Sequence, residues 1–161
     1  MEIVNITETN EDLAQMVAQF RVELRSYRGI SAQPNVESAY REIESYLTAG
    51  FPLFAARSGQ EYAGYVVCRT DGGTLWVESL FVKDEYRRRG IASALFDKAE
   101  ALAESLGEET AYNYVHPNNH RMIEFLRKRG YTVLNLIEIR KPRKNEKLAT
   151  QIMVGDHTFD Y

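Results

Sequence analysis

The chain reads Arg-Arg-Arg-Gly-Ile-Ala at residues 87–92, between an apolar run at 75–82 and an amphipathic run at 91–106. This order predicts a strand, a tight turn and a helix. The first amides of a helix lack internal partners, and the helix dipole places partial positive charge there. Gly90 lets the backbone approach a ligand closely, because glycine has no Cβ. With three arginines beside it, the turn suits a phosphate-bearing ligand.

Known phosphate loops do not account for this turn. The chain lacks Gly-x-x-x-x-Gly-Lys-Ser/Thr and offers one glycine where a dinucleotide fingerprint needs three. The turn instead fits Arg/Gln-x-x-Gly-x-Gly/Ala, with Arg87, Gly90 and Ala92 at the defined positions. The longer stretch at 77–92, Val-Glu-Ser-Leu-Phe-Val-Lys-Asp-Glu-Tyr-Arg-Arg-Arg-Gly-Ile-Ala, resembles the acetyl-CoA-binding motif of the GNAT N-acetyltransferase superfamily.

A second block, at 119–131, carries the same resemblance. It reads Asn-His-Arg-Met-Ile-Glu-Phe-Leu-Arg-Lys-Arg-Gly-Tyr and is similar to the family's Asn-x-x-Ala-x-x-Phe-Tyr-x-x-x-Gly-Phe. Two blocks in this order and at this distance are a more specific signal than either block alone. Within the superfamily, the motif is nearest to the spermidine/spermine acetyltransferase-like branch.

The resemblance implies an α/β (α+β) fold in a single N-acetyltransferase domain over residues 1–161. The implied fold has a mixed, largely antiparallel sheet with helices on both faces. Hydrophobic periodicity and turn residues predict elements in an order that fits this fold. Helices are expected at 11–27, 36–48, 91–106 and 117–129, and strands at 2–6, 51–57, 61–70, 74–82, 111–115, 131–140 and 149–159. In such folds two central parallel strands, which would be 74–82 and 111–115, splay apart, and the pantetheine arm of the cofactor enters the gap.

Composition is that of an ordinary soluble domain. The chain has 161 residues, of which 44% are hydrophobic and 27% are charged. The single cysteine, Cys68, excludes an intrachain disulfide and is expected in the core, so nothing argues for secretion. Residues 1–5 lack the features of a signal peptide, and no apolar run approaches the length of a membrane span. We therefore expect a cytoplasmic protein with no membrane partner.

Transfer of an acyl group to an amine needs a group that takes a proton from the ammonium. Glu78 lies in the apolar strand expected at 74–82, where alternation places Trp76, Glu78, Leu80 and Val82 on one side and Val77, Ser79 and Phe81 on the other. One interpretation is a salt bridge at a strand end, and the other is a general base. The resemblance favours the base, because Glu78 stands four residues before the motif's valine, where the spermidine/spermine branch carries a catalytic glutamate.

The family usually places a tyrosine in the second block, as general acid to the leaving thiolate. This sequence has Leu126 at that position, which departs from the family pattern. Tyr112 and Tyr114 lie on the short strand that would face the gap, with His116 on the same side, and Tyr131 follows the second block. Packing is the plainer interpretation of each of them. Tyr114 is the first candidate to replace the missing acid.

The resemblance also assigns the cofactor site, with acetyl-CoA as co-substrate. The pyrophosphate is expected on the amides of 88–92, and the pantetheine on the amides of Leu80 and Val82. Asn119 matches the family's pantetheine-binding asparagine and can also cap a helix. The expected cofactor-binding residues are Leu80, Phe81, Val82, Arg87, Arg88, Arg89, Gly90, Ile91, Ala92, Ser93 and Asn119. No metal is expected, because Pro117 spoils the helical alignment of His116 with His120, and His157 is remote.

The expected activity is transfer of an acetyl group from acetyl-CoA to a primary amine by direct attack in a ternary complex. An acyl-enzyme is disfavoured, because no Gly-x-Ser-x-Gly nucleophile motif is present. Two alternatives stay open: transfer from another acyl-CoA, and a catalytically weak CoA-binding regulatory module, which Leu126 favours. A nucleic-acid-binding module would rest on the arginine turn and the basic loop at 141–147, but the net charge of −3 gives it no support.

The partners are expected to be a small-molecule amine or a peptide amine, with no nucleic acid. Residues 1–50 carry eight Asp/Glu against four Lys/Arg, a surplus that could attract a cationic amine or simply be solvated. The alternating, apolar segment at 149–161 follows a charged connection and could pair with a neighbouring molecule's sheet. A homodimer is therefore possible.

Overall fold

Five strands form one sheet, in the order in which they follow each other along the chain. They are β1 (Glu2–Asn5), β2 (Leu53–Ser58), β3 (Glu61–Asp71), β4 (Thr74–Val82) and β5 (Tyr112–Asn113). Neighbouring strands are antiparallel except for β4 and β5, which are parallel. The expected mixed, largely antiparallel sheet is therefore confirmed, although β5 is shorter than the strand expected at 111–115.

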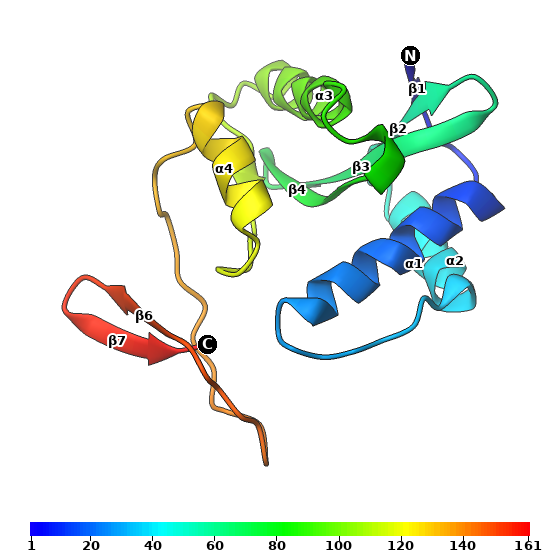
Figure 1. The fold of residues 1–161 in the computed structure, drawn as a ribbon. Helices are drawn as coiled ribbons and strands as arrows, with labels where there is room; N and C mark the ends of the chain where they lie inside the picture. The colour runs from blue at the N-terminus through cyan, green and yellow to red at the C-terminus, as the bar shows by residue number, and fades with distance from the viewer. The chain divides into compact units, whose positions relative to one another are not determined.

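The computed structural model describes all 161 residues and divides into two compact units, 1–116 and 117–161. The first unit holds the five-stranded sheet and three of the helices: α1 (Glu11–Ser26), α2 (Val36–Thr48) and α3 (Ile91–Ser105). Figure 1 shows α3 on one side of this sheet and the pair α1 and α2 on the other. Helices thus cover both faces, as the sequence predicts.

The main core lies between the sheet and the helices α1 and α2. Leu13 and Val17 of α1 and Ile43 of α2 are fully buried there, against Tyr65 and Val67 of β3. Both helices begin where an asparagine side chain accepts a hydrogen bond from a backbone amide, at 2.9 Å for Asn10 and 2.8 Å for Asn35. Such caps satisfy amides that the helix itself leaves unpaired.

Two charge pairs fasten α1 to the residues that follow β4. Near the start of α1, the Asp12 carboxylate lies 2.6 Å from Lys83 Nζ and accepts a 2.7 Å hydrogen bond from the amide of Tyr62. Near its end, Glu23 lies 2.6 Å from Arg87 Nη2. These partners hold α1 against the turn that leads into α3.

The second unit contains α4 (His120–Lys128) and a hairpin of β6 (Gln151–Val154) and β7 (His157–Asp160). The prediction of a single strand at 149–159 is wrong. Gly155, with a φ of 59°, and Asp156 form a two-residue turn between β6 and β7. Glycine readily adopts this left-handed backbone, and Gly-Asp is a typical hairpin turn.

The strand expected at 131–140 is also absent from the structure. An alternating sequence becomes a strand only where its backbone pairs with another strand, and these residues have no such partner. Their apolar side chains are exposed as a result; these are Val133, Leu134, Leu136, Ile137 and Ile139. Separately, none of the helices is both long and apolar enough to cross a membrane.

Candidate active site

The parallel pairing of β4 with β5 is very short. Trp76 lies opposite Tyr112 and Val77 opposite Asn113, and there the pairing ends. Strand β4 runs on to Val82 with no strand on that side. The expected splay between the two central strands is thus present. From Glu78 onward, β4 presents a free edge whose backbone groups can bind an extended ligand.

A β-bulge lies at the point where the splay begins. In the pairing of β3 with β4, Val67 is opposite Ser79 and Cys68 is opposite Val77, so Glu78 is the extra residue. Bulges bend a strand and re-aim its side chains, and they are frequent beside active sites.

The bulge overturns the expected alternation along β4. Tyr65 lies opposite Phe81, and both belong to the core under α1 and α2. Arg69 is four residues from Tyr65 on the same strand, so its side chain is on the same face. Glu78 contacts Arg69 and therefore faces α1 and α2, whereas Leu80 points to the α3 side. The prediction that Glu78 and Leu80 share one side is wrong.

Glu78 is held in a charge pair beside an aromatic ring. Its Oε1 accepts a hydrogen bond from Arg69 Nε at 2.5 Å, with side chains 27% and 25% exposed. Arg69 Nη1 also lies 3.5 Å from Asp71, and the guanidinium carbon is 5.4 Å from the Trp76 ring centroid. The salt bridge that was one of the two interpretations of Glu78 is therefore present. It lies at the splay rather than at a strand end. A role for Glu78 as base stays a prediction.

Aromatic rings continue the site from β4 to β5. The Trp76 ring stacks on Tyr114 with centroids 4.7 Å apart and lies 5.0 Å from Tyr112. Tyr114 is 65% exposed, so its ring has a face open to solvent. The His116 ring stacks on the ring of Tyr27, which directly follows α1, with centroids 6.1 Å apart. Burial, followed by the charge of Arg28, lowers the pKa of His116.

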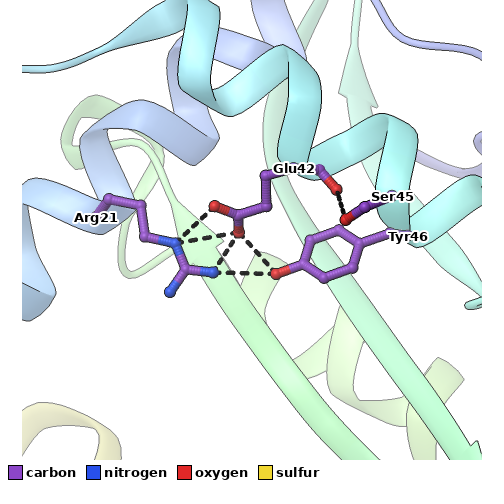
Figure 2. A network of polar contacts seen from close by, with 4 residues as sticks. All are labelled: Arg21, Glu42, Ser45 and Tyr46. Carbon is purple, nitrogen blue, oxygen red and sulfur yellow. Dashed lines mark hydrogen bonds and ion pairs between the residues drawn. The ribbon is translucent and has the colours of Figure 1, made fainter.

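A polar network between α1 and α2 borders this site (Figure 2). Arg21 Nε donates to both oxygens of Glu42, at 2.8 and 3.0 Å, and Arg21 Nη2 donates to the Tyr46 hydroxyl at 3.0 Å. The same hydroxyl donates to Glu42 at 2.6 Å. Burial first, then the bond to Glu42 and the charges of Glu42 and Glu78, raise the pKa of Tyr46. The network thus pairs Arg21 with Glu42, and its Tyr46 lies near enough to Glu78 to be affected by that charge.

Three residues of this site were not singled out from the sequence: Arg69, Trp76 as a binding surface, and Ser79. Ser79 is the one polar residue among the buried ones, and its hydroxyl has no hydrogen-bond partner. The turn Gly72–Gly73 joins the paired residues Asp71 and Thr74. Counting back from that turn along both strands places Arg69 opposite Trp76. The pairing of these two residues could therefore have been predicted from the sequence.

The turn before α3 has the form expected of an anion site. Arg88 and Gly90 have positive φ angles of 61° and 79°, and Gly90 caps α3 with no side-chain hydrogen bond to its first amides. A Cβ built on Gly90 would meet no atom within 4 Å. The amides at the start of α3 thus border open space, which fits a bound pyrophosphate.

Arg87 does not extend toward that space. Its Nε donates to the carbonyl of Val82 at 2.9 Å, and its other nitrogens pair with Glu23 and Asp84. The side chain therefore shapes the turn from inside, while Arg88 and Arg89 are exposed. The cofactor contacts expected of residues 80–82 and 87–93 stay predictions.

The remaining sequence candidates lie in other surroundings. In the second unit, Asn119 caps α4 by accepting from the amide of Met122 at 3.2 Å, and Leu126 is buried. The cap is confirmed, and the pantetheine contact of Asn119 stays a prediction. In the first unit, Cys68 is fully buried, as expected, and burial raises the pKa of its thiol to about 12. No group of three His, Cys, Asp or Glu side chains is placed to hold a metal ion.

The family of the chain follows from its match to a family model. Residues 17–131 match the model described as the acetyltransferase (GNAT) family. The chain belongs to the GNAT acetyltransferase family. This GNAT protein is thus an acetyl-CoA-dependent N-acetyltransferase, with acetyl-CoA as co-substrate.

Solved structures share the fold of this GNAT protein at low sequence identity. The aminoglycoside N-acetyltransferase AAC(6')-Iy in complex with CoA has a TM-score of 0.65 and 16% identity, covering 89% of this chain and 95% of that one. AAC(6')-IG from Acinetobacter haemolyticus has a TM-score of 0.64 and 15% identity, covering 90% and 100%. The PaiA N-acetyltransferase from Thermoplasma acidophilum, in complex with coenzyme A, has a TM-score of 0.61 and 23% identity, covering 80% and 89%. Comparison with curated proteins gave no significant match.

The turn before α3 can be tested with Gly90→Val and the matched control Gly107→Val. Both glycines have φ near 80°, at 79° and 83°, with open space around the added Cβ. Each variant should lose about 1–2 kcal/mol of unfolding free energy, because a side chain is strained in this conformation. Only Gly90→Val should also lose at least about tenfold in CoA affinity by calorimetry, since its side chain blocks the ligand. Wild-type affinity in Gly90→Val would show that the turn does not bind the cofactor.

Proposed function

We propose that the protein transfers an acetyl group from acetyl-CoA to a primary amine by direct attack, with both substrates bound at once. The observation that carries this proposal is the splay at Glu78. A strand edge free to bind pantetheine lies there beside a carboxylate, a guanidinium and an aromatic surface. The acceptor amine would approach from the face of the sheet that Glu78 shares with α1 and α2.

In this mechanism Glu78 takes a proton from the acceptor ammonium, directly or through a water molecule. The neutral nitrogen then attacks the thioester carbonyl carbon. A C–N bond forms, the C–S bond breaks, and the sulfur leaves with the electron pair as the CoA thiolate. The nitrogen then loses its second proton to solvent water. The thiolate gains a proton from a hydroxyl, for which Tyr114 is the candidate, and solvent returns a proton to that hydroxyl and takes one from Glu78. Oε2 of Glu78 makes no hydrogen bond with the protein and is the oxygen available to the ammonium.

The expected cofactor contacts belong to the same proposal. The amides of Leu80 and Val82 would bind pantetheine along β4, with Phe81 between them, and Asn119 would contribute its side-chain amide. The pyrophosphate would lie on the amides at the start of α3. The residues assigned to that part of the ligand are Arg87, Arg88, Arg89, Gly90, Ile91, Ala92 and Ser93.

The acceptor is a small-molecule amine or a peptide amine. Two structural neighbours are aminoglycoside N-acetyltransferases, which supports a small-molecule acceptor. A cytoplasmic location, where acetyl-CoA is made and used, fits this activity. Transfer from another acyl-CoA is the enzymatic alternative.

We further propose that the protein forms a homodimer, in which residues 149–161 pair with the sheet of a neighbouring molecule. The exposed apolar side chains at 133–139 support this, because such surface is usually covered in solution. Sedimentation at micromolar concentration should give the mass of two chains. The double variant Val133→Asp and Leu136→Asp should sediment as one chain if this surface contributes. A wild-type mass of one chain would contradict the dimer.

Glu78→Gln tests the base. The amide cannot accept the proton, so turnover should fall by roughly 10²–10⁴-fold with CoA affinity unchanged. Asp71→Asn is the matched control, because Asp71 contacts the same arginine and is mostly exposed. It should stay within about threefold of wild type. Thiol release with an amine panel measures both, and full activity of Glu78→Gln at pH 7 would leave Glu78 a structural group.

Tyr114→Phe tests the acid that would replace the missing tyrosine. Transfer should slow by about tenfold or more, while CoA binding stays intact, because only the hydroxyl is removed. Tyr112→Phe is the control, since its ring also contacts Trp76. Leu126→Tyr should be tolerated and should raise the rate if the thiolate is protonated from α4. A silent Tyr114→Phe, together with no acetylated amine in a broad panel, would favour a CoA-binding regulatory module.

A further inference from the structure

The charge pair of Arg69 and Glu78 has unused hydrogen-bonding groups. Arg69 donates from Nε to Glu78 Oε1 and contacts Asp71 through Nη1, but Nη2 has no acceptor in the protein. Glu78 Oε2 likewise makes no hydrogen bond with the protein. A guanidinium has five N–H donors and a carboxylate has two acceptor oxygens. The pair can therefore bind a donor and an acceptor of a ligand at once, without being broken.

The pair is held rigidly enough to select a ligand. Arg69 lies over the Trp76 ring at 5.4 Å, and Trp76 is itself stacked on Tyr114. Stacking and ion pairing fix the plane of a guanidinium, which then binds carboxylates in a defined direction. The two charged groups are in contact at 2.5 Å. A ligand that uses both must carry its own opposite charges only a few bonds apart.

The local charge does not suit an acceptor with many positive charges. Glu78 and Asp71 share Arg69, so these three groups leave one net negative charge. The neighbouring carboxylate, Glu42, is already neutralised by Arg21. A polycation needs several free carboxylates to replace its water, and a buried or half-buried positive charge that stays unpaired is costly.

We propose that the acceptor is a free amino acid with an apolar side chain. This rests on the proposed function, in which Glu78 receives the amine. The ammonium binds Glu78, the α-carboxylate binds Arg69, and the side chain lies on the exposed face of Tyr114. Arg69 is then the residue that determines the acceptor class, by binding the carboxylate rather than by taking part in proton transfer.

The test uses acceptors that differ only in the carboxylate. Phenylalanine, leucine and methionine are compared with their α-amides, and spermidine serves as a polycation, with kcat/KM measured by thiol release. At least one free amino acid should exceed its amide by about 10- to 100-fold, the range for a hydrogen bond to a charged group. Arg69→Gln should remove this preference by raising KM for the acid more than KM for the amide, so that the two acceptors become equal within about threefold. Arg69→Lys should keep part of the preference, because it keeps the charge.

Arg57→Gln is the matched control. Arg57 also pairs with a glutamate, Glu2 at 2.6 Å, but on the first two strands, away from the splay. This variant should leave the preference unchanged. Arg69→Gln leaves Glu78 without its partner and should lower the unfolding temperature. CoA affinity equal to wild type then shows that the variant is folded, which separates lost recognition from lost folding.

The outcomes distinguish this inference from the proposed function. If amines are acetylated but each amide equals its acid, the acceptor class is wrong and the acetyltransferase activity stands. If Arg69→Gln accelerates all amines, spermidine included, Arg69 blocks the ammonium site, and the inference is overturned. If no amine is acetylated, the proposed function fails, and calorimetry of the three amino acids with CoA-bound protein decides. Binding that Arg69→Gln weakens supports the site, and no binding overturns it.

Discussion

The short pairing between β4 and β5 is the constraint on which the site depends. Hydrogen bonds between parallel strands continue only while the strands stay about 4.8 Å apart, and here they stop after Val77 and Asn113. The bulge at Glu78 turns β4 at the same place. One backbone irregularity therefore does three things: it frees an edge for a ligand, points a carboxylate toward α1 and α2, and leaves the Trp76 and Tyr114 rings stacked at the start of the gap.

The helix α1 connects the two halves of the site in the first unit. Asp12 and Glu23 bind Lys83 and Arg87, which flank the turn that begins α3. Arg21, between them on the same helix, binds Glu42 of α2 beside the acceptor face. A charge pair that is half-buried is costly to break on one side only, because the other charge stays behind. The arginines and carboxylates of α1 thus fix the turn and the acceptor face against a common support.

Much of the fold was predictable, because the elements of the first unit carry strong local signals. Helix α2 and strand β4 have the expected bounds, since asparagine, glycine and proline mark their ends. The prediction of the splay rested on the resemblance of residues 77–92 and 119–131 to a known family. The bulge was not predictable, because the sequence of β4 carries no local signal that one of its residues lacks a partner on β3. The contacts of the Arg87 side chain with Val82 and Glu23 were not predictable, because no local pattern encodes such packing.

The C-terminal elements were predicted less well for a different physical reason. Residues 131–140 have the composition of a strand, yet strand formation needs a partner backbone, and sequence alternation does not name one. The hairpin of β6 and β7 was missed although its Gly-Asp turn is a recognised signal. At 149–159 the local pattern was right about extended strands and silent about the turn that pairs them, whereas at 131–140 no strand forms.

The stack of Trp76 on Tyr114 has a spectroscopic consequence. Trp76 is the only tryptophan of the chain, and its ring contacts both the Arg69 guanidinium and the exposed Tyr114 ring at the beginning of the gap. Indole emission responds to the polarity and the charges around the ring. The tryptophan fluorescence of this protein, excited selectively over that of its tyrosines, therefore comes from one defined place, and its wavelength and intensity report on what lies beside Glu78.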